Sequence, residues 1–435
     1  MNFGIQKVHL HTKGFLKRTL LVIKYKKKVL GNGLTVIVHE DNSSPMVAVN
    51  ILYKVGSKHE DPEHTGFAHL FEHLMFSGSK HVDSFDNYMQ TAGGENNAFT
   101  NADLTNFYDV VPSENLETVL WLESDRMLNL TIDKKNLDVQ RKVVVEEFKE
   151  TCLNPPYGDV HHYLSELCYK KHGYSWPTIG KDISHIEKAK LEEVSTFFDK
   201  YYGPNNAIIC LTGNIQYDQA FEQVEKWFGD IPARPTGVIE NIEEPEQTSF
   251  RTCTAYGNAP IDSLYLAFHT PHRVADNFYA CDLISDILCN GRSSRFYSKL
   301  FKEQKIVSHI DCYLTGAVDK GLLMIEAKPA EGYSIEYIKE QIWIVLEQLK
   351  AEIISEHELT KVKNKVENSI VFSEMSVVNK GINLCFFESI GDIELINSES
   401  QLYQKITAEE IHEHANKIFQ KDKCSELIYK QKEEA

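Results

Sequence analysis

The stretch Thr65–Phe76, TGFAHLFEHLMF, is the strongest indication of fold and chemistry in this chain. We predict that it forms a helix, on which His69 and His73 lie four residues apart and project from one face. Two neutral imidazoles one turn apart suit zinc, because they leave room for a third ligand and a water. The order H-x-x-E-H inverts the commoner H-E-x-x-H motif.

Glu72 lies beside the same helix face, where a carboxylate can act as a general base. Zinc lowers the pKa of a bound water to ~7, so a carboxylate can accept its proton. The rest of the helix is largely apolar, and three ionisable side chains there are costly unless they are paired or bind a metal. We therefore assign His69 and His73 as ligands of one Zn²⁺ ion and Glu72 as the base. The alternative is a surface helix with scattered polar residues.

A third protein ligand is expected from the helix predicted over Lys134–Thr151. Its segment VVVEEFKE has apolar residues on both sides of two adjacent glutamates, so one of the two should point inward. From spacing alone the candidates are Glu147, Glu146 and Glu150, in that order.

The predicted elements of the second half of the chain repeat the order of those in the first half. No sequence identity recurs at a fixed period, so we expect a duplicated architecture rather than a sequence repeat. The clearest strands have apolar or β-branched residues and short lengths. They are Leu34–His39, Met46–Val55, Asn96–Thr100, Thr105–Val111 and Asn206–Thr212 in the first half, and Ser263–Phe268, Ile306–Tyr313, Gly321–Ala327 and Glu426–Tyr429 in the second half.

Composition divides the chain into four parts. Residues 1–28 carry eight Lys and Arg residues and no acid, and we expect a disordered basic extension. Residues 29–228 form a first domain, and 229–248 form an acidic, Pro-containing linker in which Glu243 and Glu244 should be solvated. Residues 249–435 form the second domain. Each half is long enough to bury its own core.

The whole chain has 46 Lys and Arg residues against 63 Asp and Glu residues, a net charge of −17. Such an acidic chain is a poor general nucleic-acid binder. No run of ~20 apolar residues is present, so no transmembrane segment is expected. Nine widely spaced cysteines without C-x-x-C indicate a reducing compartment, which together with the absence of a secretory signal favours the cytoplasm.

The motif HLFEHLMF and the segment Arg141–Glu147, RKVVVEE, together resemble the pitrilysin (M16) family of zinc metallopeptidases. The resemblance extends over Leu34–Tyr429, and is to two-domain bacterial members similar to the mitochondrial processing peptidase beta subunit. It implies an α+β fold of two similar α/β roll domains, each a mixed, mainly antiparallel sheet packed by helices. The first domain would bind zinc and the second would not. The resemblance also implies that Glu147 is the third ligand.

Further segments carry the same resemblance. Gly93–Thr100, GGENNAFT, is similar to the family's active-site edge strand, on which the substrate backbone adds as another strand. Asn97 would then bond the substrate, and Ala98 and Phe99 would line the cleft. Lys302 and His309 stand where many relatives have an arginine and a tyrosine that contact substrate. Gln140 stands where many have a glutamate that faces the metal without binding it.

The function implied is a zinc-dependent endopeptidase (metalloendopeptidase) that cuts unfolded peptides or oligopeptides inside a chamber. Four such domains enclose the chamber in the family, and this chain supplies two of them. We therefore expect a homodimer or a heterodimer with an M16-like subunit. The alternative function is a non-catalytic structural or partner subunit of such a complex.

Overall fold

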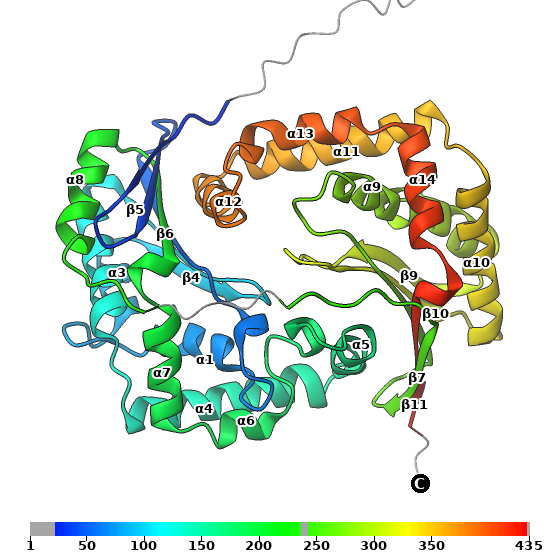
Figure 1. Ribbon diagram of the computed structural model, residues 1–435, viewed down its shortest axis with the longest axis horizontal. Helices are drawn as coiled ribbons and strands as arrows, with labels where there is room; N and C mark the ends of the chain where they lie inside the picture. The colour runs from blue at the N-terminus through cyan, green and yellow to red at the C-terminus, as the bar shows by residue number, and fades with distance from the viewer. Residues whose placement is uncertain (1–21, 236–241, 433–435) are drawn as a thin grey trace, which may run out of the picture.

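The computed structural model describes residues 22–235 and 242–432 and contains two mixed sheets, each packed by helices (Figure 1). This confirms the α+β fold class. The first sheet has the order β1-β2-β6-β3-β5-β4 and the second has the order β7-β11-β8-β10-β9. The strands are β1 (Lys26–Val29), β2 (Thr35–Glu40), β3 (Met46–Tyr53), β4 (Glu95–Thr100), β5 (Thr105–Pro112), β6 (Ala207–Gly213), β7 (Arg251–Gly257), β8 (Ser263–His269), β9 (Val307–Leu314), β10 (Leu322–Pro329) and β11 (Cys424–Gln431).

The two sheets share one topology once β1 is set aside. In each sheet the first and last strands of the half pair in parallel, β2 with β6 and β7 with β11, and the remaining pairs are antiparallel. The duplicated architecture expected from the order of elements is therefore present. β4 and β9 occupy equivalent edges of the two sheets.

The helices of the first half include the predicted metal-binding helix and the helix of the candidate glutamates. They are α1 (Phe67–Leu74), α2 (Phe85–Thr91), α3 (Leu116–Asn129), α4 (Lys134–Phe148), α5 (Val160–Cys168), α6 (Ile183–Glu187), α7 (Leu191–Tyr201) and α8 (Tyr217–Phe228). Those of the second half are α9 (Phe278–Cys289), α10 (Ile335–Ala351), α11 (Glu356–Ser373), α12 (Val377–Ser389), α13 (Leu395–Lys405) and α14 (Ala408–Ile418). Sequence analysis did not predict α5, α6 or α13.

Each half sends one helix to the sheet of the other half. On α12, Leu384 and Cys385 are buried against Ile37 and Ile208 of the first sheet. Conversely, α5 packs on β7 and β11 of the second sheet. Figure 1 shows α12 beside β6 and α5 beside β7 and β11. Each half buries a core of its own, as expected, and the exchanged helices form two further clusters in which one face of each sheet is covered by the opposite half.

The basic segment is ordered over its last residues, contrary to the expectation of disorder through residue 28. Lys26–Val29 forms β1, which pairs antiparallel with β2. Ile23 is buried, and its backbone N–H donates to Asn397 Oδ1 at 2.8 Å. Residues 1–21 of the predicted extension lie outside the described residues.

The linker is docked rather than solvated at Glu244. This carboxylate is 3% exposed and accepts the backbone N–H groups of Lys170, Lys171 and His172 at 2.8–3.0 Å. Residues 236–241 of the predicted linker lie outside the described part of the chain.

No single helix in the described ranges is long and apolar enough to cross a membrane. Helices α11 and α12 pass that test of length and composition only when taken together, and they meet at a bend of 110°.

Candidate metal centre

Helix α1 places its ionisable residues on one side because its apolar residues anchor the other. Phe67, Leu70, Phe71 and Leu74 are each at most 3% exposed and belong to the core of the first half. His69, Glu72 and His73 therefore lie on the less buried side of the helix. The helix packs against α4 and against the edge strand β4.

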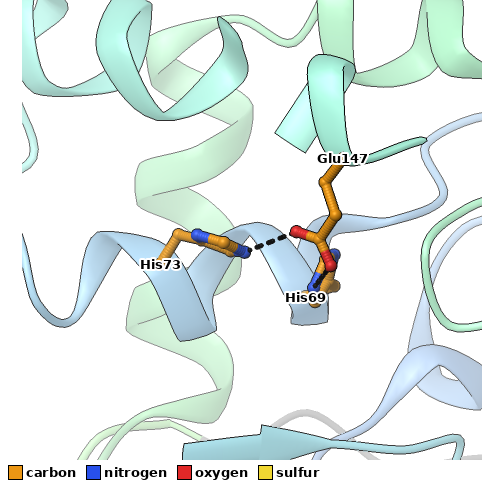
Figure 2. Close-up of side chains that lie close together, drawn as sticks. All are labelled: His69, His73 and Glu147. Atoms are coloured by element: carbon orange, nitrogen blue, oxygen red, sulfur yellow. Dashed lines mark ion pairs between the residues drawn. The ribbon is translucent and has the colours of Figure 1, made fainter. Parts of the chain in front are cut away.

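Glu147 of α4 points at both imidazoles of α1 (Figure 2). His69 Nε2 lies 3.5 Å from Glu147 Oε1, and His73 Nε2 lies 3.1 Å from Glu147 Oε2. The two rings are nearly perpendicular, with centroids 4.9 Å apart. One ligand atom from each residue lies within 4.8 Å of the other two, and no other group of this kind occurs within residues 22–235 and 242–432.

These three residues fit zinc in chemistry and in spacing. Ligands held ~2.1 Å from a tetrahedral centre are ~3.4 Å from one another. The separations from His69 Nε2 to Glu147 Oε1, 3.5 Å, and from His73 Nε2 to Glu147 Oε2, 3.1 Å, are close to that value. Two imidazoles and one carboxylate also make the donor set of a catalytic site that keeps a fourth position open.

The structure decides which of Glu146, Glu147 and Glu150 is the third candidate ligand, a choice that spacing alone left undecided. Glu146 is exposed and pairs with Lys149 at 2.7 Å, and Glu150 is exposed beyond the end of α4. Only Glu147 reaches the histidines. Hydrogen bonding to His69, followed by that to His73, holds the pKa of the Glu147 carboxyl well below its usual range. The carboxylate is therefore available as an anionic ligand.

Glu72 lies on α1 between the two histidines in sequence, and its side chain is partly exposed. It forms no hydrogen bond or ion pair with the residues that the structure describes, so both carboxylate oxygens are available for a water or a substrate proton. This position suits the predicted general base, whose role stays a prediction.

Gln140 lies two turns before Glu147 on α4 and ties that helix to the end of α1. Its Nε2 donates to Ser77 Oγ at 2.9 Å, and Ser77 Oγ donates to the His73 carbonyl at 3.4 Å. The side chain thus supports the backbone that carries a candidate ligand rather than the imidazole ring. The family resemblance predicted that Gln140 faces the metal without binding it, but it did not predict Ser77 as the intermediary.

Strand β4 is an edge of the first sheet, paired only with β5. The Asn101 N–H bonds Leu104 C=O across the hairpin. Hydrogen-bonded and non-hydrogen-bonded pairs alternate along an antiparallel ladder, so the N–H of Ala98, three residues before Asn101, faces away from β5. It donates instead to Asn97 Oδ1 at 2.8 Å. Phe99 is 37% exposed, so its ring is not core packing.

Lys302 and His309 lie in the second half, apart from the three candidate ligands. Lys302 is exposed in the π-helical segment Tyr297–Glu303. His309 is exposed on the edge strand β9, with Nε2 3.8 Å from Glu326 Oε1. No contact among the described residues joins either side chain to His69, His73 or Glu147, and their substrate contacts stay predictions.

Sequence reasoning missed Glu60, which binds the start of α1. Its carboxylate is 7% exposed and accepts backbone N–H groups at residues 66 and 68. Nothing in the spacing of Glu60 indicates this role. The one available signal was Gly66, which begins the helix without a side chain that could cap it.

The fold and the site define a class: a two-sheet α+β protein whose first half carries an H-x-x-E-H helix facing a distal glutamate. Residues 35–182 match the family model of insulinase (peptidase family M16), and residues 188–366 match that of the peptidase M16 inactive domain. The chain therefore belongs to peptidase family M16. All three candidate ligands lie within the first match.

Known relatives are similar over most of their length. Zinc protease PqqE of Helicobacter pylori is 28% identical over 346 residues, which cover 78% of each chain. The uncharacterized zinc protease YmxG of Bacillus subtilis is 27% identical, covering 82% of this chain and 86% of the relative. The crystal structure of a protease from H. pylori matches with a TM-score of 0.89 at 25% identity, covering 94% of this chain and 100% of that one.

Proposed function

We propose that this chain is a zinc-dependent endopeptidase that hydrolyses peptide bonds of unfolded peptides. The observation that carries the proposal is the convergence of His69, His73 and Glu147 beside Glu72, whose carboxylate bonds no other described residue. Two relatives are named zinc proteases, which supports a zinc peptidase function.

In the proposed mechanism, His69, His73 and Glu147 would hold one Zn²⁺ ion. When bound, zinc supplies Lewis acidity, which makes water more acidic and polarises a carbonyl. Glu72 takes a proton from the attacking water while the water oxygen bonds to the scissile carbonyl carbon. Glu72 then gives that proton to the leaving amine as the carbon–nitrogen bond breaks.

Substrate would bind as an extra strand on the free edge of β4, which packs beside α1. Such pairing uses main-chain groups, so it places little demand on substrate sequence. Asn97 would release the Ala98 N–H to the incoming backbone, and Phe99 would contact substrate side chains. Lys302 and His309 would add contacts from the second half.

We further propose that two chains pair, as a homodimer or as a heterodimer with an M16-like subunit, to enclose the site. An open edge strand next to a hydrolytic centre would otherwise accept any exposed peptide. Enclosure would admit unfolded peptides and exclude folded proteins. Size-exclusion chromatography with light scattering should give about twice the monomer mass for the homodimer.

Substitution Glu72→Gln tests the proposed function and separates it from a non-catalytic subunit. The amide cannot accept the water proton, so cleavage of a quenched peptide should fall by ~10²–10⁴-fold while stoichiometric zinc remains bound. Glu150→Gln, at an exposed glutamate just beyond the end of α4, is the matched control and should retain full activity. Cleavage that survives Glu72→Gln contradicts the mechanism, and purified wild-type protein that neither binds zinc nor cleaves contradicts the function.

A further inference from the structure

Helix α1 begins without a cap of its own. Its N-cap residue is Gly66, which has φ +86° and no side chain, and its first turn contains no acidic residue. The N–H groups of a first helical turn have no partner within the helix. A cap from elsewhere is therefore needed to fix the start of the helix that carries His69 and His73.

Glu60 supplies that cap from six residues upstream. Its Oε2 accepts the Gly66 N–H at 2.9 Å and its Oε1 accepts the Ala68 N–H at 2.8 Å. A carboxylate at this position also interacts favourably with the helix dipole. Because Ala68 directly precedes His69, the two bonds hold the backbone at the first candidate ligand.

The Glu60 carboxylate is itself held in place. Trp176 Nε1 donates to Glu60 Oε2 at 3.2 Å and to the Ser57 carbonyl at 3.1 Å. Burial raises the pKa of Glu60 to about 8. Burying a charge is unfavourable unless hydrogen bonds compensate for it, and here three N–H donors offset part of that cost. A surface turn that merely preceded the helix would not need this arrangement.

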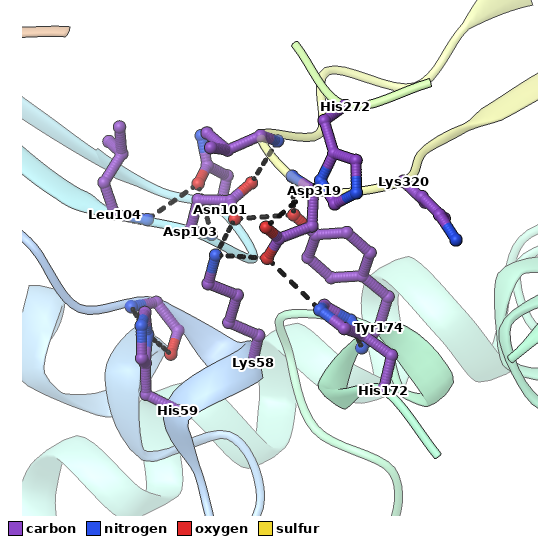
Figure 3. A network of polar contacts seen from close by, with 12 residues as sticks. Lys58, His59, Asn101, Asp103, Leu104, His172, Tyr174, His272, Asp319 and Lys320 are labelled. Carbon is purple, nitrogen blue, oxygen red and sulfur yellow. Dashed lines mark hydrogen bonds and ion pairs between the residues drawn. The ribbon is translucent and has the colours of Figure 1, made fainter. Parts of the chain in front are cut away.

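The second half of the chain reaches the same turn. Lys58, two residues before Glu60, has Nζ 2.7 Å from Asp319 Oδ2 and 2.6 Å from Asp103 Oδ1. Asp319 lies in the connection between β9 and β10, and His172 Nε2 approaches it at 3.2 Å. Figure 3 shows Lys58 between the two aspartates.

Close packing leaves the Lys58 turn little freedom. A Cβ added at Gly173 would lie 2.3 Å from the Lys58 carbonyl oxygen, so only glycine permits this approach. Asp103 lies just beyond β4, and its Oδ2 accepts the Val318 N–H at 3.0 Å. The same polar network therefore joins the turn before α1, the end of the edge strand and the second half.

We propose that Glu60 is a positioning residue for the metal centre, and that Asp319 of the second half holds the turn of Glu60 in place through Lys58. The inference rests on the proposed function for its consequence in catalysis. Metal binding provides a readout that does not depend on turnover. The second half, which supplies none of the three candidate ligands, would thereby contribute to the geometry of the metal site.

The first experiment compares Glu60→Gln and Glu60→Ala in the full chain. Gln keeps one acceptor oxygen and Ala keeps none, so zinc affinity should fall by ~10–100-fold in Glu60→Ala and by less in Glu60→Gln, as for other supports of metal ligands. The absorption spectrum of the Co²⁺-loaded protein should change in the same order. The control is Glu63→Gln, at an exposed glutamate in the same loop, which should match wild type.

The second experiment uses Asp319→Asn, which touches no residue of α1, with exposed Asp276→Asn as its control. Zinc affinity should fall several-fold. The double variant with Glu60→Gln should lose less binding free energy than the sum of the two single losses, since both residues act through one turn.

Folded Glu60→Gln and Asp319→Asn proteins with wild-type zinc affinity and Co²⁺ spectrum would overturn the proposal. If Glu60→Ala does not fold, the other two variants decide. A wild-type protein that binds metal without cleaving peptides would contradict the proposed function and leave this test valid.

Discussion

At the scale of single residues, adjacent glutamates of α4 have opposite environments. Glu147 faces the two imidazoles, while Glu146 faces solvent and Lys149. Successive residues on a helix are separated by about 100°, so only one of a neighbouring pair can point at a given partner. The pair is therefore an internal control for the metal assignment.

Substitution Glu147→Gln should lower zinc affinity by on the order of a hundredfold or more. That loss exceeds the ~10–100-fold loss of affinity expected when a residue that only supports a metal ligand is replaced. The amide keeps the shape of the side chain but supplies no negative charge. Glu146→Gln should leave the affinity unchanged. Competition with a chelating dye measures both, and equal effects of the two substitutions would contradict the assignment of Glu147.

His269 makes stability depend on pH. Burial lowers its pKa to about 4, and the charge of Arg251 acts in the same direction. The unfolded histidine titrates near 6.5, so its contribution to stability is complete above ~6.5 and is lost as the pH falls toward 4. At pH 5 this costs about 2 kcal/mol relative to pH 7.5.

Substitution His269→Phe should remove that part of the pH dependence. Urea unfolding at pH 7.5 and pH 5 should show a smaller loss of unfolding free energy in the variant than in wild type, by about 2 kcal/mol. His357→Gln, at an exposed histidine, should behave as wild type. An unchanged loss in His269→Phe would show that His269 is protonated in the folded state.

At the scale of elements, β4 is an edge that no other described strand covers, and the proposed function uses it to bind a substrate strand. Its residues alternate between bonding β5 and facing outward, as in any antiparallel pair. Neighbouring positions on β4 should therefore respond differently to loss of the backbone N–H.

Substitution Ala98→Pro removes an outward N–H that does not bond β5. Proline is tolerated at such edge positions, so stability should change little while kcat/KM falls through loss of a substrate hydrogen bond. Phe99→Pro removes an inward N–H and should destabilise the sheet instead. Thermal unfolding and peptide kinetics separate the two effects, and an unimpaired kcat/KM in Ala98→Pro would contradict substrate addition to β4.

At the scale of the whole molecule, the exchange of α5 and α12 should make the two halves one folding unit, because each helix is buried against the opposite half. Leu384 of α12 is fully buried between the halves, whereas Phe372 at the end of α11 is 71% exposed. The two side chains are similar in hydrophobicity, so their difference in burial should decide their effect on stability.

Substitution Leu384→Ala should lower the unfolding free energy by about 2–5 kcal/mol, and both halves should unfold in one transition. Phe372→Ala should change it by less than ~0.5 kcal/mol. Urea unfolding followed by circular dichroism makes the comparison. A first half that stays folded after the second has unfolded would contradict the single unit.

Much of the fold and part of the site were predictable from local sequence. His69, Glu72 and His73 share a helix side because their spacing is set by helical geometry within one turn. Most strands were predictable because their apolar runs are short and continuous. The duplication followed from the order of these elements, although β1, α5, α13 and the docked Glu244 were missed because their burial depends on distant partners.

By itself, then, the sequence determined the H-x-x-E-H helix, the order of elements and three candidates for the third ligand, since each depends on residues close together in the chain. The tertiary structure, independently of the family resemblance, decided that Glu147 is the glutamate that faces the histidines. It alone revealed the cap by Glu60, the reach of Asp319 to Lys58, and the exchange of α5 and α12. Those features join residues up to hundreds of positions apart, and packing rather than local spacing brings them together.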